Sequence, residues 1–127
     1  VNKFIYHFKE PETGDVIVFK YPEDPKKDFI KRLIAKEGDE VQIINGNIWV
    51  NGKIVEDPRI RNIYYYNRGD YGKTGQKISV PENSFFVLGD NSASSRDSRY
   101  WGFVPKRSLL GRAFVIYWPF TRVRLIE

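Results

Sequence analysis

The stretch "EVQIINGNIWVNGKIV", residues 40–55, decides the fold class. Three short runs rich in β-branched residues are separated by two Asn-Gly pairs, Asn45-Gly46 and Asn51-Gly52. Asn-Gly between such runs is typical of the tight turns that join antiparallel strands, because both residues tolerate positive φ. The stretch therefore predicts a hairpin followed by another tight turn and a third short strand.

The same strand-like pattern continues on both sides of this hairpin. Further strands are predicted within residues 15–21, 28–39, 77–90 and 109–127, the last of them bent at Pro119. Residues 22–27 are predicted to be a polar loop broken by proline. Helical patterns are short, and they predict single turns at residues 98–102 and 105–109.

Residues 56–78 interrupt this pattern, because they are polar, rich in tyrosine and contain glycine. They are predicted to form an excursion or a small cap, with one short strand near residues 63–66. We therefore expect a single catalytic-core domain over residues 1–127 with an all-β fold. It consists mainly of antiparallel sheets around a partly open, barrel-like core, with one or two short helical turns.

Composition excludes several kinds of site. The 127 residues contain no cysteine, which excludes a disulfide scaffold, a thiolate nucleophile and a cysteine zinc site. The single histidine, His7, leaves no histidine cluster for a metal, and no cofactor is expected. No apolar run is long enough to span a bilayer, and no signal peptide is visible. The chain opens with Val1 rather than methionine, which leaves open that it is part of a longer protein.

The net charge of +5 admits a nucleic acid, an anionic membrane surface or an acidic partner. The charges are not gathered in a tail, so a solvated basic surface is the simplest interpretation.

A basic pair, Lys31-Arg32, stands inside the apolar run "FIKRLI". Side chains alternate between the two faces of a strand, so either register puts one basic group among apolar neighbours. Burial disfavours the ammonium form of a lysine, and a neutral lysine can act as a general base. An arginine keeps its proton and would need a carboxylate partner. The alternative is an edge strand with two solvated basic side chains.

A second stretch, "LGDNSASSRDSRYWGF" at residues 88–103, crowds serines and charged pairs between two apolar segments. Its hydroxyl groups could orient a lysine amine, and Asp90 and Asp97 could pair with Arg32 and Arg99. The plain alternative is a serine-rich turn without chemistry. Together, the basic pair and this loop raise the hypothesis of a serine–lysine hydrolase.

Three segments resemble conserved boxes of the type I signal (leader) peptidases, in the same order. They are "GDVIVFKYP" (14–22), "FIKRLIAKEGD" (29–39) and "GDNSASSRDSRYWGFVP" (89–105), and "GRAFVIYWPF" (111–120) resembles the family's closing strand. The resemblance covers most of the chain except the tyrosine-rich excursion.

The resemblance implies roles for individual residues. Lys31 matches the general base of the family, and Ser95 matches the hydroxyl that orients the lysine. The charged positions that hold the loop against the base-bearing strand correspond to Arg32, Asp90, Asp97 and Arg99. The strand that lines the substrate cleft corresponds to Asp28, Phe29 and Ile30. No metal takes part.

The chain also departs from the family pattern. Ala35-Lys36-Glu37-Gly38-Asp39 stands where Gly-Leu-Pro-Gly-Asp is usual, and Ser92 stands where arginine is frequent. The family's nucleophilic serine belongs to a Ser-x-x-Pro box upstream of residue 14, and no serine precedes Gly14 here. We therefore expect the chain to lack the nucleophile and the membrane anchor, and to be inactive alone. Five other serines are not expected to replace the nucleophile: Ser84, Ser92, Ser94, Ser98 and Ser108.

The resemblance implies a signal peptidase I, a membrane-associated serine endopeptidase that removes signal peptides from secreted preproteins with a Ser-Lys dyad. The expected partners are signal peptides, bound as an added strand, and the membrane surface. The catalytic domain is expected on the outer, extracytoplasmic face of the cell membrane. Tyr117, Trp118 and Phe120 could touch the membrane, although strand core is an equal alternative for such side chains.

Three alternatives stay open at the level of sequence, and one of them is a non-catalytic fragment that only binds signal peptides. The other two are different kinds of domain. One is a related Ser-Lys self-cleaving repressor domain, which would share the dyad. The other is a basic β-domain that binds peptide or single-stranded nucleic acid through tyrosines such as Tyr64, Tyr65 and Tyr66. Nucleic acid is not the expected partner, because that function gives no reason for Lys31, Ser95 and Asp97 to match one enzyme family together.

Overall fold

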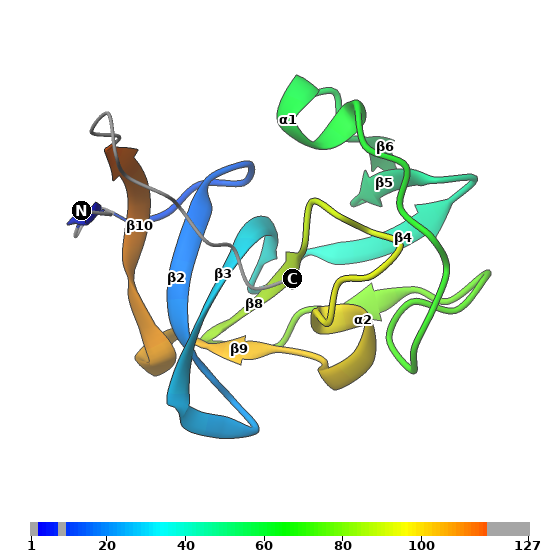
Figure 1. Cartoon of the computed structure of the whole chain (residues 1–127). Coiled ribbons are helices and arrows are strands. Elements are labelled where there is room, and N and C mark those ends of the chain that lie inside the picture. The colour runs from blue at the N-terminus through cyan, green and yellow to red at the C-terminus, as the bar shows by residue number, and fades with distance from the viewer. Residues whose placement is uncertain (1–2, 8–9, 117–127) are drawn as a thin grey trace.

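The computed structural model describes residues 3–7 and 10–116. Within these residues the strands form two antiparallel sheets (Figure 1). The larger sheet curls and has six strands, in the spatial order β1 (Lys3–His7), β10 (Leu109–Ile116), β2 (Val16–Tyr21), β3 (Asp24–Lys36), β8 (Ser84–Leu88) and β9 (Val104–Pro105). The smaller sheet has the order β6 (Lys53–Ile54), β5 (Asn47–Val50), β4 (Glu40–Ile44) and β7 (Ile78–Ser79). The prediction of an all-β fold with mainly antiparallel sheets is confirmed.

In the described part of the chain, three short helical segments connect these strands: α1 (Pro58–Arg61), α2 (Ser98–Trp101) and the 3₁₀ turn η1 (Lys106–Ser108). The helical turns predicted at residues 98–102 and 105–109 correspond to α2 and η1.

The two Asn-Gly turns have the backbone that their sequence predicts. Asn45 and Gly46 have φ values of 49° and 81°, and Asn51 and Gly52 have 53° and 80°. Consecutive positive φ values let the turn follow the twist of the flanking strands, so β4, β5 and β6 pair in sequence.

The prediction of a loop over residues 22–27 is wrong in part. Only Pro22 and Glu23 form the turn, and β3 begins at Asp24, opposite Tyr21. Pro25 lacks an N–H, but it lies in the exposed end of the hairpin, where no ladder bond requires one.

The strand predicted near residues 63–66 is absent. The Tyr65 N–H donates to Gly46 O, and the Tyr66 N–H donates to Ser92 Oγ, so the backbone of this segment is satisfied by a turn and a side chain rather than by a strand partner. The same excursion begins with α1, whose N-cap is Asp57; the carboxylate accepts a hydrogen bond from the Arg59 N–H.

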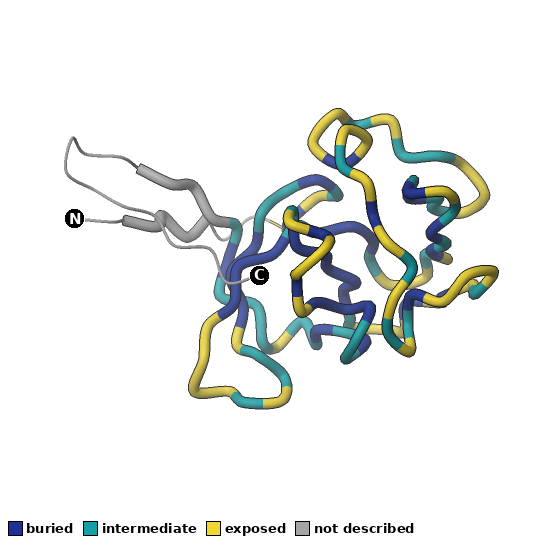
Figure 2. Tube along the Cα trace, turned by 45° about the vertical axis from the view of Figure 1, so that its right-hand side comes forward, coloured by how far each residue is buried: buried dark blue, intermediate teal, exposed yellow. Residues whose placement is uncertain are grey.

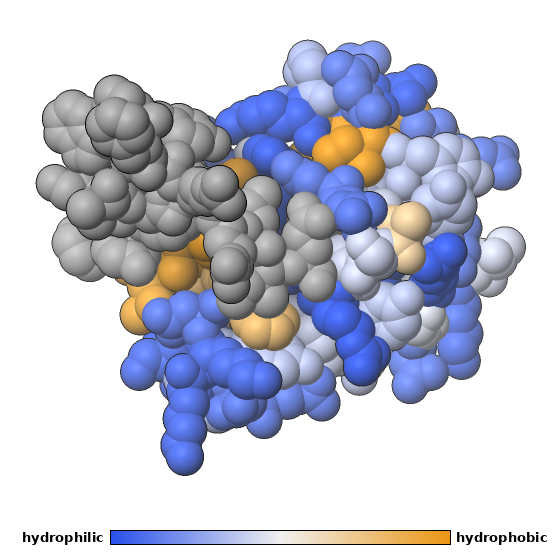
Figure 3. All heavy atoms as spheres, in the orientation of Figure 1, coloured by the Kyte–Doolittle hydropathy of each residue, from blue (hydrophilic) through white to orange (hydrophobic). Residues whose placement is uncertain are grey.

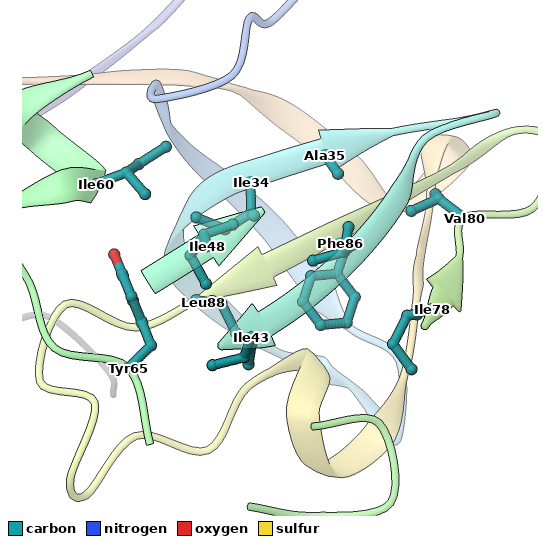
Figure 4. Close-up of a cluster of buried hydrophobic side chains, with 11 residues drawn as sticks. Ile34, Ala35, Ile43, Ile48, Ile60, Tyr65, Ile78, Val80, Phe86 and Leu88 are labelled. Carbon is teal, nitrogen blue, oxygen red and sulfur yellow. The ribbon is translucent and has the colours of Figure 1, made fainter. Parts of the chain in front are cut away.

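Hydrophobic side chains form two clusters. The first comprises Ile34, Ala35, Val41, Ile43, Ile48, Ile60, Tyr65, Ile78, Val80, Phe86 and Leu88 (Figure 4). The second comprises Ile17, Phe19, Phe29, Leu33, Phe85, Val87 and Val104. Ile60 and Tyr65 lie at one side of the first cluster in Figure 4, so the excursion contributes to a hydrophobic core.

Strands β3 and β8 supply both clusters. Along β8, Phe85 and Val87 belong to one cluster, and Phe86 and Leu88 to the other, as alternation along a strand requires. In β3 the register against β8 shifts between Leu33 and Ala35, so Ile34 is an extra residue. This bulge lets three consecutive residues of β3 be fully buried.

The surface is polar around this interior. Figure 2 shows the buried segments gathered in the middle of the molecule and the exposed ones at its hairpin and loop ends. On the face shown in Figure 3, hydrophilic residues dominate the coloured surface, and hydrophobic atoms form small separate patches. Within residues 3–7 and 10–116, no helix has the length and apolar character needed to cross a membrane.

Candidate active site

Lys31 lies on β3 of the larger sheet and pairs with Ile17 of β2, whereas the pairing of β3 with β8 begins one residue later, at Arg32. The alternative of a solvated basic side chain is wrong for Lys31, because this residue is buried. The Lys31 side chain is buried, with only 2% of the residue exposed. Its Nζ lies 3.2 Å from Ser95 Oγ and 5.5 Å from the centre of the Phe29 ring. A lysine amine is therefore held in a largely apolar setting beside a serine hydroxyl.

Ser95 is placed by the turn that follows β8. Its N–H donates to Asn91 O over 2.9 Å, and the residue is 2% exposed. The structure thus brings Lys31 and Ser95, 64 positions apart in the sequence, into a buried contact. The arrangement directs the hydroxyl at the amine and leaves little of the serine open to solvent.

Asp97 and Arg99 form a fully buried ion pair beneath this turn. Arg99 Nε and Nη2 each donate to one carboxylate oxygen over 2.9 Å, and neither side chain is exposed. The same carboxylate accepts hydrogen bonds from the Gly89 N–H and the Arg99 N–H. Four donors therefore satisfy Asp97, and the pair joins the end of β8 to the start of α2.

Arg32 and Asp90 form the second pair expected from the sequence. Arg32 Nε and Nη2 donate to the two Asp90 oxygens over 2.9 and 2.7 Å, and Nη1 donates to Gly14 O over 2.8 Å. The hydrogen bond to Asp90 raises the pKa of Arg32 above its usual value. This two-point contact fastens the start of the loop to the base-bearing strand.

The residues expected to line a substrate cleft immediately precede Lys31. Asp28 is exposed, whereas Phe29 and Ile30 are 8% and 9% exposed. The Phe29 ring stacks on Tyr21, with ring centres 4.2 Å apart and an interplanar angle of 5°. Desolvation, followed by the hydrogen bond to Glu23, raises the pKa of Tyr21 to about 12, so this phenol is neutral.

Two serines have structural roles that the sequence did not reveal. Ser98 Oγ accepts the Val87 N–H over 2.9 Å, which ties α2 to β8. Ser92 Oγ accepts hydrogen bonds from Arg99 and from the Tyr66 N–H. Only the general excess of hydroxyl groups in the loop pointed to them. Among the described residues, no group of three or more His, Cys, Asp or Glu residues could hold a metal.

Comparison with known proteins identifies the family. The model of the family described as "Signal peptidase, peptidase S26" matches residues 1–118. The chain belongs to the signal peptidase family.

Individual relatives of this signal peptidase family member agree with the match. A probable signal peptidase I-2 from Synechocystis is 43% identical over 99% of this chain and 57% of its own length. A signal peptidase I from Leptolyngbya laminosa is 40% identical over 97% of this chain and 61% of its own length. The chain therefore spans about three fifths of the length of these relatives.

A solved structure agrees with the fold. The crystal structure of a signal peptidase I from Enterococcus faecalis matches with a TM-score of 0.67 and 30% identity, over 84% of this chain and 98% of that chain. Lys31, Ser95 and the two ion pairs of this signal peptidase family member lie in segments that the family model covers.

Proposed function

We propose that this chain is the catalytic core of a signal peptidase I, a membrane-associated serine endopeptidase that cleaves signal peptides from secreted preproteins. The observation that carries the proposal is the buried contact between Lys31 Nζ and Ser95 Oγ. Family membership supports it, because the relatives are named as signal peptidases.

Lys31 is the general base of the proposed reaction. A serine hydroxyl attacks the scissile carbonyl and its proton passes to the Lys31 amine. The resulting ammonium protonates the leaving nitrogen as the C–N bond breaks, so the mature protein departs and the signal peptide stays on the serine as an acyl-enzyme. The Lys31 amine, neutral again, then accepts a proton from the water that attacks the ester and releases the signal peptide. Burial at 2% exposure supports this role, because removal from water disfavours the ammonium form and leaves an amine that can accept a proton.

Ser95 acts as the orienting hydroxyl rather than as the nucleophile. The distance to Lys31 alone would permit either role, but a serine that is 2% exposed is poorly placed to attack a peptide. The nucleophile of the proposed enzyme is the serine of a Ser-x-x-Pro segment. None of the serines printed in this sequence, from Ser79 to Ser108, has proline three positions later.

The substrate binds as an added strand beside residues 28–31. Strand β2 pairs with these residues on one side, whereas β8 begins its pairing only at Arg32. No other described strand pairs with residues 28–31. An extended peptide can therefore use this edge, with small side chains before the cut resting near Phe29 and Ile30.

The location and partners follow from the same proposal. The substrates are signal peptides of secretory preproteins, and the catalytic core works on the extracytoplasmic face of the cell membrane. The residues predicted to touch the membrane, Tyr117, Trp118 and Phe120, lie outside the described residues, and their contact stays a prediction. The self-cleaving repressor and the nucleic-acid-binding domain are not favoured by the relatives reported above.

Cleavage of a preprotein peptide with Ala-x-Ala before the cut tests the proposal. The assay compares the chain as printed, a version extended upstream with the Ser-x-x-Pro segment of a signal peptidase I relative, and two variants of the extended version. We expect cleavage by the extended version. Lys31→Ala is expected to lower kcat about 10³-fold, as the loss of a general base does. Lys53→Ala, which removes an exposed lysine, is expected to leave kcat unchanged.

Each contrary outcome has a definite meaning. Cleavage by the chain as printed would place the nucleophile within these 127 residues. Equal activity of the Lys31→Ala and Lys53→Ala variants would exclude Lys31 as the base. A folded but inactive extended version would refute the proposed peptidase activity.

A further inference from the structure

The excursion at residues 56–78 reaches the turn that carries Ser95. The Arg68 side chain donates to Ala93 O, and the Tyr71 N–H donates to Arg99 O over 2.8 Å. Tyr66 makes two further contacts: its N–H donates to Ser92 Oγ, and its carbonyl accepts a hydrogen bond from Arg99 Nη1 over 2.9 Å. Four hydrogen bonds therefore join residues 66–71 to residues 92–99.

Ser92 accepts one of these hydrogen bonds and is also bonded to Arg99. Its hydroxyl oxygen accepts two hydrogen bonds, from the Tyr66 N–H and from Arg99 Nη1, each over 3.0 Å. Its carbonyl accepts a third, from Arg99 Nη2 over 2.9 Å. A serine hydroxyl has two acceptor sites, so both are used, and the residue is only 4% exposed. Removing the hydroxyl would leave these two donors without this acceptor.

Ser92 and Ser95 belong to the same tight turn. The N–H groups of Ser94 and Ser95 both donate to Asn91 O, which fixes the turn from its first residue. A shift of Ser92 therefore moves the backbone that carries Ser95. Since the Ser95 hydroxyl is already 3.2 Å from Lys31 Nζ, a small shift would break that hydrogen bond.

We infer that Ser92 is a positioning residue through which the excursion at 56–78 holds Ser95 against Lys31. This inference rests on the proposed function, because it assigns the excursion a part in aligning the dyad rather than in binding substrate. The excursion is thus required for the rate of the chemical step, and the buried Ser92 hydroxyl is the main contact through which it acts.

Three variants test the inference in the extended enzyme. Ser92→Ala removes the shared acceptor, Ser92→Thr keeps it, and Ser94→Ala changes an exposed neighbour in the same turn. We expect Ser92→Ala to lower kcat about tenfold with KM unchanged, the effect of losing about one hydrogen bond from the aligned state. Ser92→Thr should restore most of kcat, and Ser94→Ala should match the parent.

A second readout uses the chain as printed and does not depend on cleavage. Trace acetic anhydride acetylates lysine amines, and mass spectrometry compares the labelling of Lys31 with that of exposed Lys53. Release of Lys31 from Ser95 should raise its relative labelling about fivefold in Ser92→Ala, and Ser92→Thr should reverse the rise. A purely structural role would lower the melting temperature and leave both the labelling ratio and kcat unchanged, which would overturn the inference.

The two proposals can fail separately. If the parent extended enzyme does not cleave, the proposed function fails. The labelling ratio of Lys31 to Lys53 then tests by itself whether Ser92 holds Ser95 against Lys31. If the parent cleaves and folded Ser92→Ala matches it in kcat and labelling, the inference fails alone. If Ser92→Ala does not fold, Arg68→Ala serves instead, because it removes an exposed side chain that contacts Ala93 O. It should change kcat and labelling in the same direction by about twofold, and no change would refute the inference.

Discussion

Gly89 lies so close to Ser95 that a Cβ atom at residue 89 would stand 1.8 Å from Ser95 Oγ. The same atom would lie 3.4 Å from Lys31 Nζ. A side chain at this position would therefore enter the space that the serine and lysine share. Glycine is required here by close approach.

Gly89→Ala is expected to displace Ser95 and to lower kcat of the extended enzyme about 10²-fold, as a misplacement of about 1 Å does. Steady-state kinetics with the preprotein peptide measures the change. Gly52→Asn is the control, because nothing lies within 4 Å of a Cβ at residue 52 and asparagine tolerates the positive φ there. Equal kcat values for the two variants would contradict the close contact.

Asp97→Asn is expected to destabilise the fold more than Asp90→Asn. Removing one partner of the fully buried Asp97–Arg99 pair leaves an unpaired charge and should lower the free energy of unfolding by about 3–5 kcal/mol. The Arg32–Asp90 pair has side chains 14% and 35% exposed, so water compensates in part and the loss should be about 1.5 kcal/mol. Urea unfolding of both variants measures the difference, and similar losses would contradict the argument from burial.

Gly46→Ala and Gly52→Ala separate backbone strain from packing. Both glycines follow asparagine in a tight turn and have nearly equal φ, 81° and 80°. Alanine in this conformation should cost about 1 kcal/mol at each position. At residue 46 the added Cβ would also stand 2.2 Å from the Tyr64 ring, whereas residue 52 has open space. We expect Gly46→Ala to lose about 1–3 kcal/mol more than Gly52→Ala.

The Tyr64→Ala background provides the check on this pair. Tyr64 is 58% exposed, so removing its ring should cost little by itself. In that background the two glycine substitutions should have similar effects on the free energy of unfolding. A difference that persists would show that Tyr64 is not its cause.

The Glu37–Lys106 pair should make stability depend on pH. The hydrogen bond from Lys106, followed by the one from the Asn83 N–H, holds the pKa of Glu37 below its usual 4.5. A carboxylate whose pKa is lower in the folded state stabilises the fold above pH 4.5, and this contribution is lost as pH falls through the folded-state pKa. The hydrogen bond to Glu37 likewise raises the pKa of Lys106 above 10.5, so that contribution is lost only as pH rises beyond this value.

Melting temperatures of the parent and Glu37→Gln between pH 2 and pH 8 measure this effect. The parent should be the more stable above about pH 5, and the two curves should converge toward the acid end. Added salt should narrow the gap, because the pair is exposed. A difference in melting temperature that stays constant from pH 2 to pH 8 would show that the charge of Glu37 is not its cause.

The sequence predicted the tight turns of this fold, because a turn depends on the conformation of a few neighbouring residues. The Asn-Gly turns required positive φ, and the structure has it at all four residues. The burial of Lys31 was not decided by sequence, because a solvated side chain fitted the same pattern. It depends on the contact with Ser95, 64 positions away, and on the pairing of the rest of β3 with β8, and periodicity reports neither.

Sequence analysis predicted the site residues that carry a charge or belong to a family motif. It missed the residues whose role depends only on how the chain folds. Asp90 and Asp97 could be matched to arginines because a buried charge demands a partner. The role of the Ser92 hydroxyl depends on the Tyr66 N–H, which comes from the excursion. The strand predicted at residues 63–66 failed for the same reason, since the backbone donors of that segment are satisfied by Gly46 and Ser92 rather than by a neighbouring strand.

Strands β3 and β8 contribute side chains to both hydrophobic clusters, and this affects how the protein unfolds. Leu33 and Ile34, adjacent in the chain, belong to different clusters, as do Phe85 and Phe86. Neither cluster can therefore unfold while β3 and β8, which both clusters need, stay paired. The amides that β3 and β8 hydrogen-bond to one another, between Arg32 and Lys36 and between Phe85 and Leu88, should exchange with solvent deuterium at one common, slowest rate, governed by opening of the whole sheet. The lysine that sits on β3 is thus carried by the last part of the protein to open.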